Sequence, residues 1–308
     1  MSKRVIRELW DRHYESLEGK IRPGCEPRMY LQGEAAQHAI VLVHGLTDSP
    51  HYVDAIGRRF HAMGFDVLLP LLPAHGLKAP EGMKGVTPEQ WMREIDWMTE
   101  LAGRLAPRVS IGGLSTGATL SVYKAITSPD LVTGGLFLFS AALDLAGPLG
   151  NFAERLLRFA PFVKYIADWQ DRESPGLIGI NPYRYARRDY EGAAALARLI
   201  GYIEDRYPEQ KKYSDVVQPL FVAHSEADAV TDITEVELLV AHHAGGADAS
   251  CFFRIPKDVG VRHASVVLEA DVRALHGPAG DPAILEAKNP LFNEMMACVA
   301  SFVDTHLR

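Results

Sequence analysis

A chain of 308 residues, 47% hydrophobic and 23% charged, is long enough for one large α/β domain or two small domains with a deep core. Its formal net charge of −7, with no block of like charge, argues against a nucleic-acid partner, because phosphate binding requires a basic face. The chain contains no run of about 18 apolar residues, so no membrane-spanning segment is predicted.

The cysteines and the first residues point to a cytoplasmic protein. Cys25, Cys251 and Cys298 are scattered and form no CxxC or Cys/His cluster with metal-ligand spacing, so we expect no metal site. Three reduced thiols are typical of a reducing compartment. Residues 1–20 are rich in charge and lack the apolar region of a secretory signal.

Apolar runs bounded by glycine, proline and aspartate alternate with segments of helical period along most of the chain. In chain order we expect a short strand at 28–31, a strand at 38–43, a helix at 51–63, a strand at 65–72, a helix at 87–105, a strand at 108–112, a helix at 118–127, strands at 135–142 and 219–223, a helix at 233–243, a strand at 251–255 and a helix at 291–306. Thr87 and Gln90 predict a capping box, with Pro88 at the first helical position. The alternation predicts an α/β fold with a mostly parallel sheet and helices on both faces.

One segment, residues 145–217, interrupts this alternation with helical patterns and no convincing strand. Its aromatic and arginine content is high: Phe152, Phe159, Phe162, Tyr165, Trp169, Tyr183, Tyr185, Tyr190, Arg155, Arg158, Arg184, Arg187 and Arg188. We interpret it as a helical cap inserted between two core portions, 1–144 and 218–308. An apolar cover near the strand ends favours uncharged, small-to-medium apolar substrates, although the arginines leave open an acidic substrate group.

The strongest chemical signal is Gly113-Leu114-Ser115-Thr116-Gly117, between a predicted strand and a predicted helix. A serine on such a tight turn is exposed at the carboxyl edge of the sheet, and small residues two positions away on either side relieve the crowding. The helix N-terminus also offers N–H groups where negative charge develops. The pattern therefore predicts Ser115 as a nucleophile.

A serine nucleophile needs a base, and the base needs a group that orients it. In this kind of fold the acid and then the histidine follow the serine along the chain. The turn after the 219–223 strand carries Asp228, which we choose as the acid; Glu226 is a rival, and Asp232 is interpreted as a helix-start residue. His263, in the loop after the last strand, is favoured as the base over His276.

The oxyanion formed during acyl transfer requires two preorganised N–H donors. We expect one from the backbone of Thr116, the residue after the nucleophile, and the other from Leu46, in the loop after the 38–43 strand. His44, which opens that loop, is interpreted as a structural brace rather than a base.

Several motifs resemble those of bacterial carboxylesterases and monoacylglycerol lipase-like members of the α/β-hydrolase superfamily, and they occur in the same order along the chain. They are HGLTDSP at 44–50, LLPAHG at 71–76, TPEQW at 87–91, GLSTG at 113–117, the D-x-V starting at Asp228, and His263-Ala264-Ser265. The resemblance implies a core sheet of about eight strands, a lid after the sixth, and a Ser-Asp-His triad that needs no cofactor. Relatives often have Pro-Gly-His-Gly where this chain has Ala74, and Met or Gln where it has Thr116.

The sequence thus predicts a serine hydrolase that cleaves carboxylic esters through an acyl-enzyme, with a small-molecule ester as its partner. Amide or peptide hydrolysis by the same triad is the nearest alternative. A non-catalytic binding protein on the same fold is another, but it would be marked by a broken triad, and here all three positions have candidates. Dehalogenase or epoxide-hydrolase chemistry is disfavoured, because aspartate usually replaces the serine there.

Overall fold

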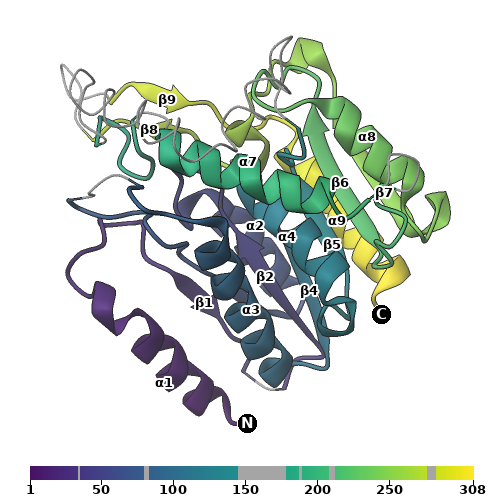
Figure 1. Ribbon diagram of the computed structural model, residues 1–308, viewed down its shortest axis with the longest axis horizontal. Coiled ribbons are helices and arrows are strands. Elements are labelled where there is room, and N and C mark those ends of the chain that lie inside the picture. The colour runs from purple at the N-terminus through teal and green to yellow at the C-terminus, as the bar shows by residue number, and fades with distance from the viewer. Residues whose placement is uncertain (34, 80–82, 145–177, 187–188, 208–211, 276–281) are drawn as a thin grey trace.

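The computed structural model describes residues 1–33, 35–79, 83–144, 178–186, 189–207, 212–275 and 282–308. A seven-stranded sheet forms the centre of this part of the chain, in the order β1-β3-β2-β4-β5-β6-β7 (Figure 1). Its strands are β1 (Arg28–Tyr30), β2 (His38–Val43), β3 (Phe65–Leu69), β4 (Arg108–Leu114), β5 (Leu136–Phe139), β6 (Leu220–Ser225) and β7 (Ser250–Ile255). Only the pairing of β1 with β3 is antiparallel, so the carboxyl ends of the six other strands meet at one edge.

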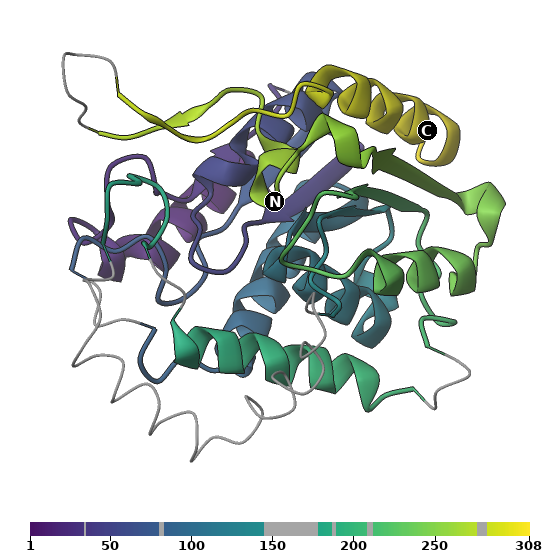
Figure 2. The same ribbon diagram turned by 90° about the horizontal axis from the view of Figure 1, so that it is seen from above.

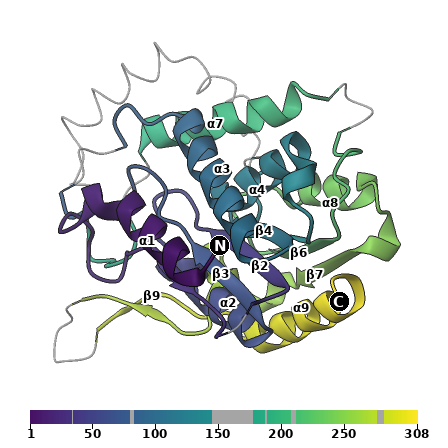
Figure 3. The same cartoon turned by 90° about the horizontal axis from the view of Figure 1, so that it is seen from below.

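Helices cover both faces of the sheet, as Figure 3 shows from below. One face packs against α2 (His51–Ala62) and α9 (Phe292–His306). The other face packs against α3 (Pro88–Leu105), α4 (Thr116–Thr127) and α8 (Ile233–His242). Helix α1 (Lys3–Tyr14) packs on α3, and α7 (Tyr190–Glu204) packs on α3 and α4. Seen from above, α7 runs along one side of the molecule, and the β8–β9 hairpin (Val272–Arg273 and Ile284–Glu286) extends outward on another side (Figure 2).

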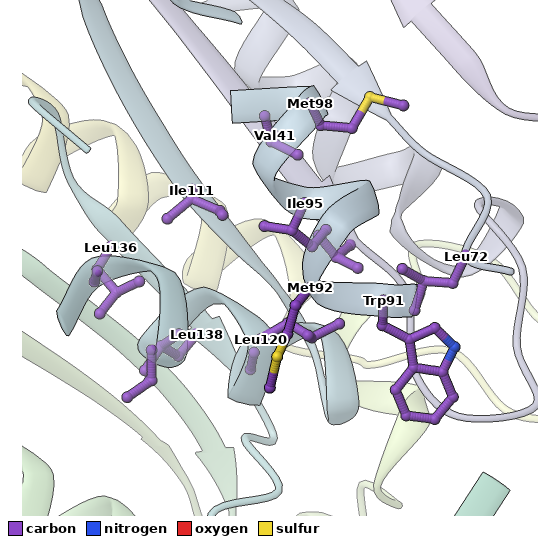
Figure 4. Close-up of a cluster of buried hydrophobic side chains, with 14 of the residues drawn as sticks. Val41, Leu72, Trp91, Met92, Ile95, Met98, Ile111, Leu120, Leu136 and Leu138 are labelled. Atoms are coloured by element: carbon purple, nitrogen blue, oxygen red, sulfur yellow. The ribbon is translucent and has the colours of Figure 1, made fainter. Parts of the chain in front are cut away.

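The core follows from the two-residue period of the strands. In β2, Val41 belongs to the cluster under α3 and α4, whereas its neighbours Ile40 and Leu42 belong to the cluster under α2 and α9. From Ala39 to Val43 this strand is buried on both faces, which explains the continuous apolar run in its sequence. The first cluster joins strand residues to side chains of α3 and α4, among them Trp91, Met92, Ile95, Ile111, Leu120, Leu136 and Leu138 (Figure 4).

The mostly parallel α/β fold predicted from the alternating pattern is confirmed, and the strands and helices expected from the sequence lie where they were predicted, with ends that differ by a few residues. The predicted capping box opens α3, with the backbone N–H of Thr87 donating to Gln90 Oε1 at 2.9 Å. The main sheet has seven strands in the described residues rather than the eight or so that the resemblance implied.

Two elements had no counterpart in the sequence analysis. Helix α1 was overlooked because its residues are rich in charge, yet Ile6, Trp10 and Tyr14 recur every four positions and bury one face against the core. The β8–β9 hairpin follows the loop that contains His263. Most of the predicted cap aromatics, including Phe152, Phe162 and Trp169, lie outside the described residues; α7 is the helix described in that segment.

Candidate active site

Ser115 stands at the junction of β4 and α4 in a conformation that L-residues rarely adopt, with φ 54° and ψ −117°. The glycines on either side make this turn possible. A Cβ atom on Gly113 would lie 2.2 Å from the Val43 carbonyl oxygen, and one on Gly117 would lie 2.1 Å from the same atom. The turn can therefore press against the end of β2 only when both positions lack a side chain.

Asp228 and His263 are brought together although they come from different loops. Asp228 lies in the segment after β6 and His263 in the segment after β7. His263 Nδ1 lies 2.6 Å from Asp228 Oδ2. Because an ionised carboxylate can only accept, the ring donates from Nδ1, and Nε2 of the neutral ring is left to accept a proton. Asp228 is fixed in turn by the backbone N–H groups of Val230 at 2.8 Å and Thr231 at 3.2 Å.

These contacts favour the ionised form of the carboxyl group. Burial by itself would raise the pKa of Asp228, but the hydrogen bond and charge of His263 and the Val230 N–H outweigh it and hold the pKa below its usual value. A permanently negative Asp228 is suited to orient an imidazole and to stabilise its protonated form.

The two alternative acids have other partners in the structure. Glu226 turns toward Arg254 and the Lys257 backbone N–H, and more than a third of its side chain is exposed. Asp232 caps α8 by accepting from the Thr234 N–H at 2.8 Å, as the sequence predicted. His276, the alternative base, lies outside the described residues.

Of the two predicted oxyanion donors, one directly follows Ser115 in the chain and the other belongs to a residue that lines the same cavity. Thr116 is the first residue of α4, where a backbone N–H has no partner within the helix. Leu46 lies in the loop after β2, and its side chain lines the same cavity as Ser115. His44 braces that loop: its Nδ1 bonds the Gly45 carbonyl at 2.9 Å, and its Nε2 accepts from the Leu72 N–H at 3.1 Å. Burial lowers the pKa of His44 to about 4, which keeps the ring neutral.

A cavity of about 640 Å³ opens over these groups, and both Ser115 and His263 line it. Much of its wall is apolar and comes from separate elements: Leu46, Ala142, Leu196, Val230 and Leu285. Ser115, His263 and an apolar space thus share one site at the carboxyl edge of the sheet, where ligands bind in open α/β sheets.

Known proteins share this architecture across nearly the whole chain. A structure from a study of two metagenome-derived lipolytic enzymes, LipS and LipT, superimposes with a TM-score of 0.65 at 17% identity, covering 93% of this chain and all of that one. A monoacylglycerol lipase from Paleococcus ferrophilus gives a TM-score of 0.59 at 19% identity, covering 91% and 99%. A soluble variant of monoglyceride lipase from Saccharomyces cerevisiae gives 0.62 at 12% identity, covering 91% and 90%. The chain has the α/β-hydrolase fold.

Sequence comparison adds a narrower likeness. The chain is 30% identical over 122 residues to a thermostable monoacylglycerol lipase from Bacillus sp. (strain H-257). The aligned segment covers 40% of this chain and 46% of the relative, so the chain spans about half the length of that relative. No family model matches the chain.

The cavity beside Ser115 also has a polar wall that the sequence analysis did not identify. Arg184 donates from Nε to Asp48 at 2.5 Å and from Nη1 to Glu286 at 2.7 Å, and its guanidinium lies 4.5 Å from the centre of the Tyr52 ring. Glu286 also accepts from Tyr52 Oη at 2.5 Å and from Asn181 Nδ2 at 3.3 Å. Arg184 was noted only as one of several arginines, and Asp48 only as part of the motif at 44–50. No local signal marks Glu286, and the pairing of these residues could not be seen because the partners are distant in sequence.

The polar wall pairs one guanidinium, that of Arg184, with two carboxyl groups. Burial would lower the pKa of Arg184, but Asp48, Tyr52 and Glu286 outweigh it and raise that pKa above its ordinary value. Burial raises the pKa of Glu286 despite the neighbouring guanidinium. Arg184 therefore remains charged but is already paired with two carboxyl groups.

The described residues contain no group of three or more His, Cys, Asp or Glu side chains that could hold a metal ion. None of the helices in the same residues is long and apolar enough to cross a membrane.

Proposed function

We propose that this α/β-hydrolase cleaves carboxylic esters through an acyl-enzyme, with Ser115 as nucleophile, His263 as base and Asp228 as the group that orients it. One observation carries the proposal. Ser115, held at positive φ on the elbow, lines the same cavity as His263, and His263 is hydrogen-bonded to Asp228. Nucleophile, base and orienting acid are the three parts that acyl transfer to serine requires.

The reaction has two halves. Ser115 Oγ attacks the ester carbonyl carbon while His263 Nε2 takes the hydroxyl proton, and the backbone N–H groups of Leu46 and Thr116 stabilise the oxyanion. The tetrahedral intermediate then expels the alcohol, which leaves with the proton from His263. Water attacks the acyl-enzyme in the same way, with His263 again accepting the proton, and releases the acid and free Ser115.

The cavity supports uncharged substrates of small to medium size. Its wall is largely apolar, and two arginines line it. Arg184 is engaged by Asp48 and Glu286 and so is poorly placed to receive an anionic substrate, and Arg262 is exposed to solvent. The similarity to lipolytic enzymes and monoacylglycerol lipases is consistent with an acyl chain on one side of the ester.

The division of the chain is also a proposal: core residues 1–144 and 218–308, and a cap at 145–217. It is supported by α7, whose residues Ala193 and Leu196 line the cavity beside Ser115. A cytoplasmic location and the lack of a nucleic-acid partner remain predictions.

Phenylmethanesulfonyl fluoride labelling followed by peptide mass mapping tests the nucleophile. We expect the label on Ser115, and we expect the Ser115→Ala variant to lose hydrolysis of a series of nitrophenyl esters of increasing acyl length. A fluorogenic ester and its matching anilide at equal concentration should show strong preference for the ester. Label on another serine, or full activity in Ser115→Ala, would refute the proposal; faster cleavage of the anilide would point to an amidase.

A further inference from the structure

Two consecutive residues of the segment ahead of α7 are bonded to the loop that supplies the predicted oxyanion donor Leu46. The backbone N–H of Tyr185 donates to the Thr47 carbonyl at 2.9 Å. The side chain of the preceding residue, Arg184, donates from Nε to Asp48 Oδ1 at 2.5 Å. The two residues after Leu46 are therefore each tied to a segment far away in the sequence.

The loop needs such support. Thr47 has φ 66°, which is an outlier for a β-branched residue and persists only where the surroundings enforce it. Within the loop, the Asp48 N–H donates to the Gly45 carbonyl at 3.2 Å, which closes a tight turn around Leu46. The direction of the Leu46 N–H depends on the geometry of this turn.

The Asp48 carboxylate lies close to Ser115, on the other side of Gly45. A Cβ atom on Gly45 would lie 2.6 Å from Asp48 Oδ2 and 3.3 Å from Ser115 Cβ, so the carboxylate and the serine meet across that glycine. Asp48 is only 2% exposed. A buried negative charge at this place disfavours the oxyanion unless a cation compensates it, and Arg184 is that cation.

Arg184 is itself held in place from the other side. Glu286, at the end of the β8–β9 hairpin, binds its Nη1 at 2.7 Å, and the Tyr52 ring lies beneath the guanidinium. Glu286 is fixed by Tyr52 Oη and Asn181 Nδ2. The guanidinium therefore has little freedom to leave Asp48, and the loop is held by a rigid partner.

We propose that Arg184 is a positioning residue for the oxyanion hole: through Asp48, and together with the Tyr185 N–H, it fixes the 45–48 turn so that the Leu46 N–H points to the developing oxyanion. The inference rests on the proposed ester hydrolysis at Ser115. A group that acts in this way contributes to the transition state rather than to substrate binding. Its removal lowers kcat by the same factor for every ester, whereas loss of a pocket wall changes KM and chain-length preference.

The kinetic test compares Arg184→Met and Arg184→Lys with Arg254→Met. Arg254 is a matched control, because it also bridges two carboxylates, Glu226 and Glu237, but on exposed surface of β7. For Arg184→Met we expect kcat about 10- to 100-fold lower, with KM within about threefold, on both an acetate and an octanoate ester. A trifluoromethyl ketone, which forms an oxyanion on the serine, should bind weaker by the same factor. Arg184→Lys should recover part of the loss, and Arg254→Met should resemble the wild type.

Hydrogen exchange of the backbone in residues 44–49 provides a test that does not depend on activity. In Arg184→Met the exchange of this segment should accelerate, while exchange in β2 and the melting temperature change little. If the wild type hydrolyses esters, either of two results would overturn the role of Arg184. One is unchanged exchange of residues 44–49 in Arg184→Met, and the other is a loss of activity confined to KM or to esters with long acyl chains. A wild type that cleaves no ester, with exchange still faster in the variant, would instead refute the proposed function and leave the loop support intact.

Discussion

Two turns near the oxyanion loop each hold a residue with a side chain at positive φ, but they are stabilised in different ways. Ser115, at φ 54°, lies between two glycines whose missing side chains let the turn pack against the Val43 carbonyl. Ala74, at φ 68°, stands where relatives often have glycine. Its carbonyl accepts from Tyr185 Oη at 2.9 Å, and the preceding carbonyl, that of Pro73, accepts from Trp91 Nε1 at 3.3 Å.

The difference shows two ways to stabilise an unfavourable backbone conformation. At the Ser115 turn, the glycines two positions away on either side permit the positive φ, so the motif can be recognised within five residues of sequence. At the Ala74 turn, side chains from α3 and from the segment before α7 enforce it, so the sequence around Ala74 gives no sign of its conformation. Changes at the two turns should therefore have different consequences.

The largest effect is expected where the elbow loses its chemical partners. His263→Ala should lower kcat by about 10⁴- to 10⁶-fold, and Asp228→Asn by about 10⁴-fold, because the imidazole then lacks its orienting carboxylate. Steady-state kinetics on a nitrophenyl ester measures both. Glu226→Gln is the matched control for the acid and should keep its activity within about twofold, since Glu226 is engaged with Arg254. A severe loss in Glu226→Gln with an active Asp228→Asn would reverse the assignment.

The steric basis of the elbow is tested by Gly117→Ala. The new Cβ would lie 2.1 Å from a backbone oxygen, which has no room to move, so the free energy of unfolding should fall by about 3 kcal/mol. Gly103→Ala, on α3, is the control: its Cβ would meet only Val109 Cγ2 at 4.0 Å, and it should gain about 0.5–1 kcal/mol from helix propensity. Urea denaturation followed by circular dichroism gives both values, and equal effects would contradict the steric account.

The free energy of unfolding should depend on pH through His44, which opens the loop after β2. Burial lowers the pKa of His44 to about 4, whereas an exposed histidine titrates near about 6.5, so between these values the unfolded chain binds a proton that the folded chain does not. Stability therefore falls as the pH drops from about 6.5 to 4. His44→Gln should make this slope shallower by about 1.4 kcal/mol per pH unit. Parallel curves of unfolding free energy against pH for variant and wild type would show that His44 does not contribute.

The smallest effect is expected at the Ala74 turn. Ala74→Gly removes the penalty of a Cβ at positive φ, of about 1–2 kcal/mol, but adds freedom to the unfolded chain. The net gain in unfolding free energy should be about 0.5–1 kcal/mol, with kcat unchanged. Thermal melting checks it. A loss of stability would show that the contacts around the turn need the Ala74 methyl group and that strain is not the dominant effect.

The sequence by itself determined the α/β fold, the elements around the sheet and the choice of Ser115, Asp228 and His263 as candidates. These inferences depend on local features: two-residue and helical periods, a capping box at Thr87, and an elbow whose glycines lie beside the serine. The order of the motifs then limited where an acid and a base could follow. Even helix α1, which was overlooked, carries its signal locally in Ile6, Trp10 and Tyr14.

Only the tertiary structure decided which side chains surround those candidates. Asp48, Arg184 and Glu286 come from three distant parts of the chain, and a charged residue on a predicted loop is usually solvated, so their pairing could not be predicted even though Asp48 lies in the motif at 44–50. The positive φ of Ala74 and Thr47 is likewise enforced by Tyr185 from outside their own turns. The periodicity of a segment indicates which of its residues face the core. Contacts between side chains of different loops depend on where the sheet places the ends of those loops, and these positions are set only in the folded chain.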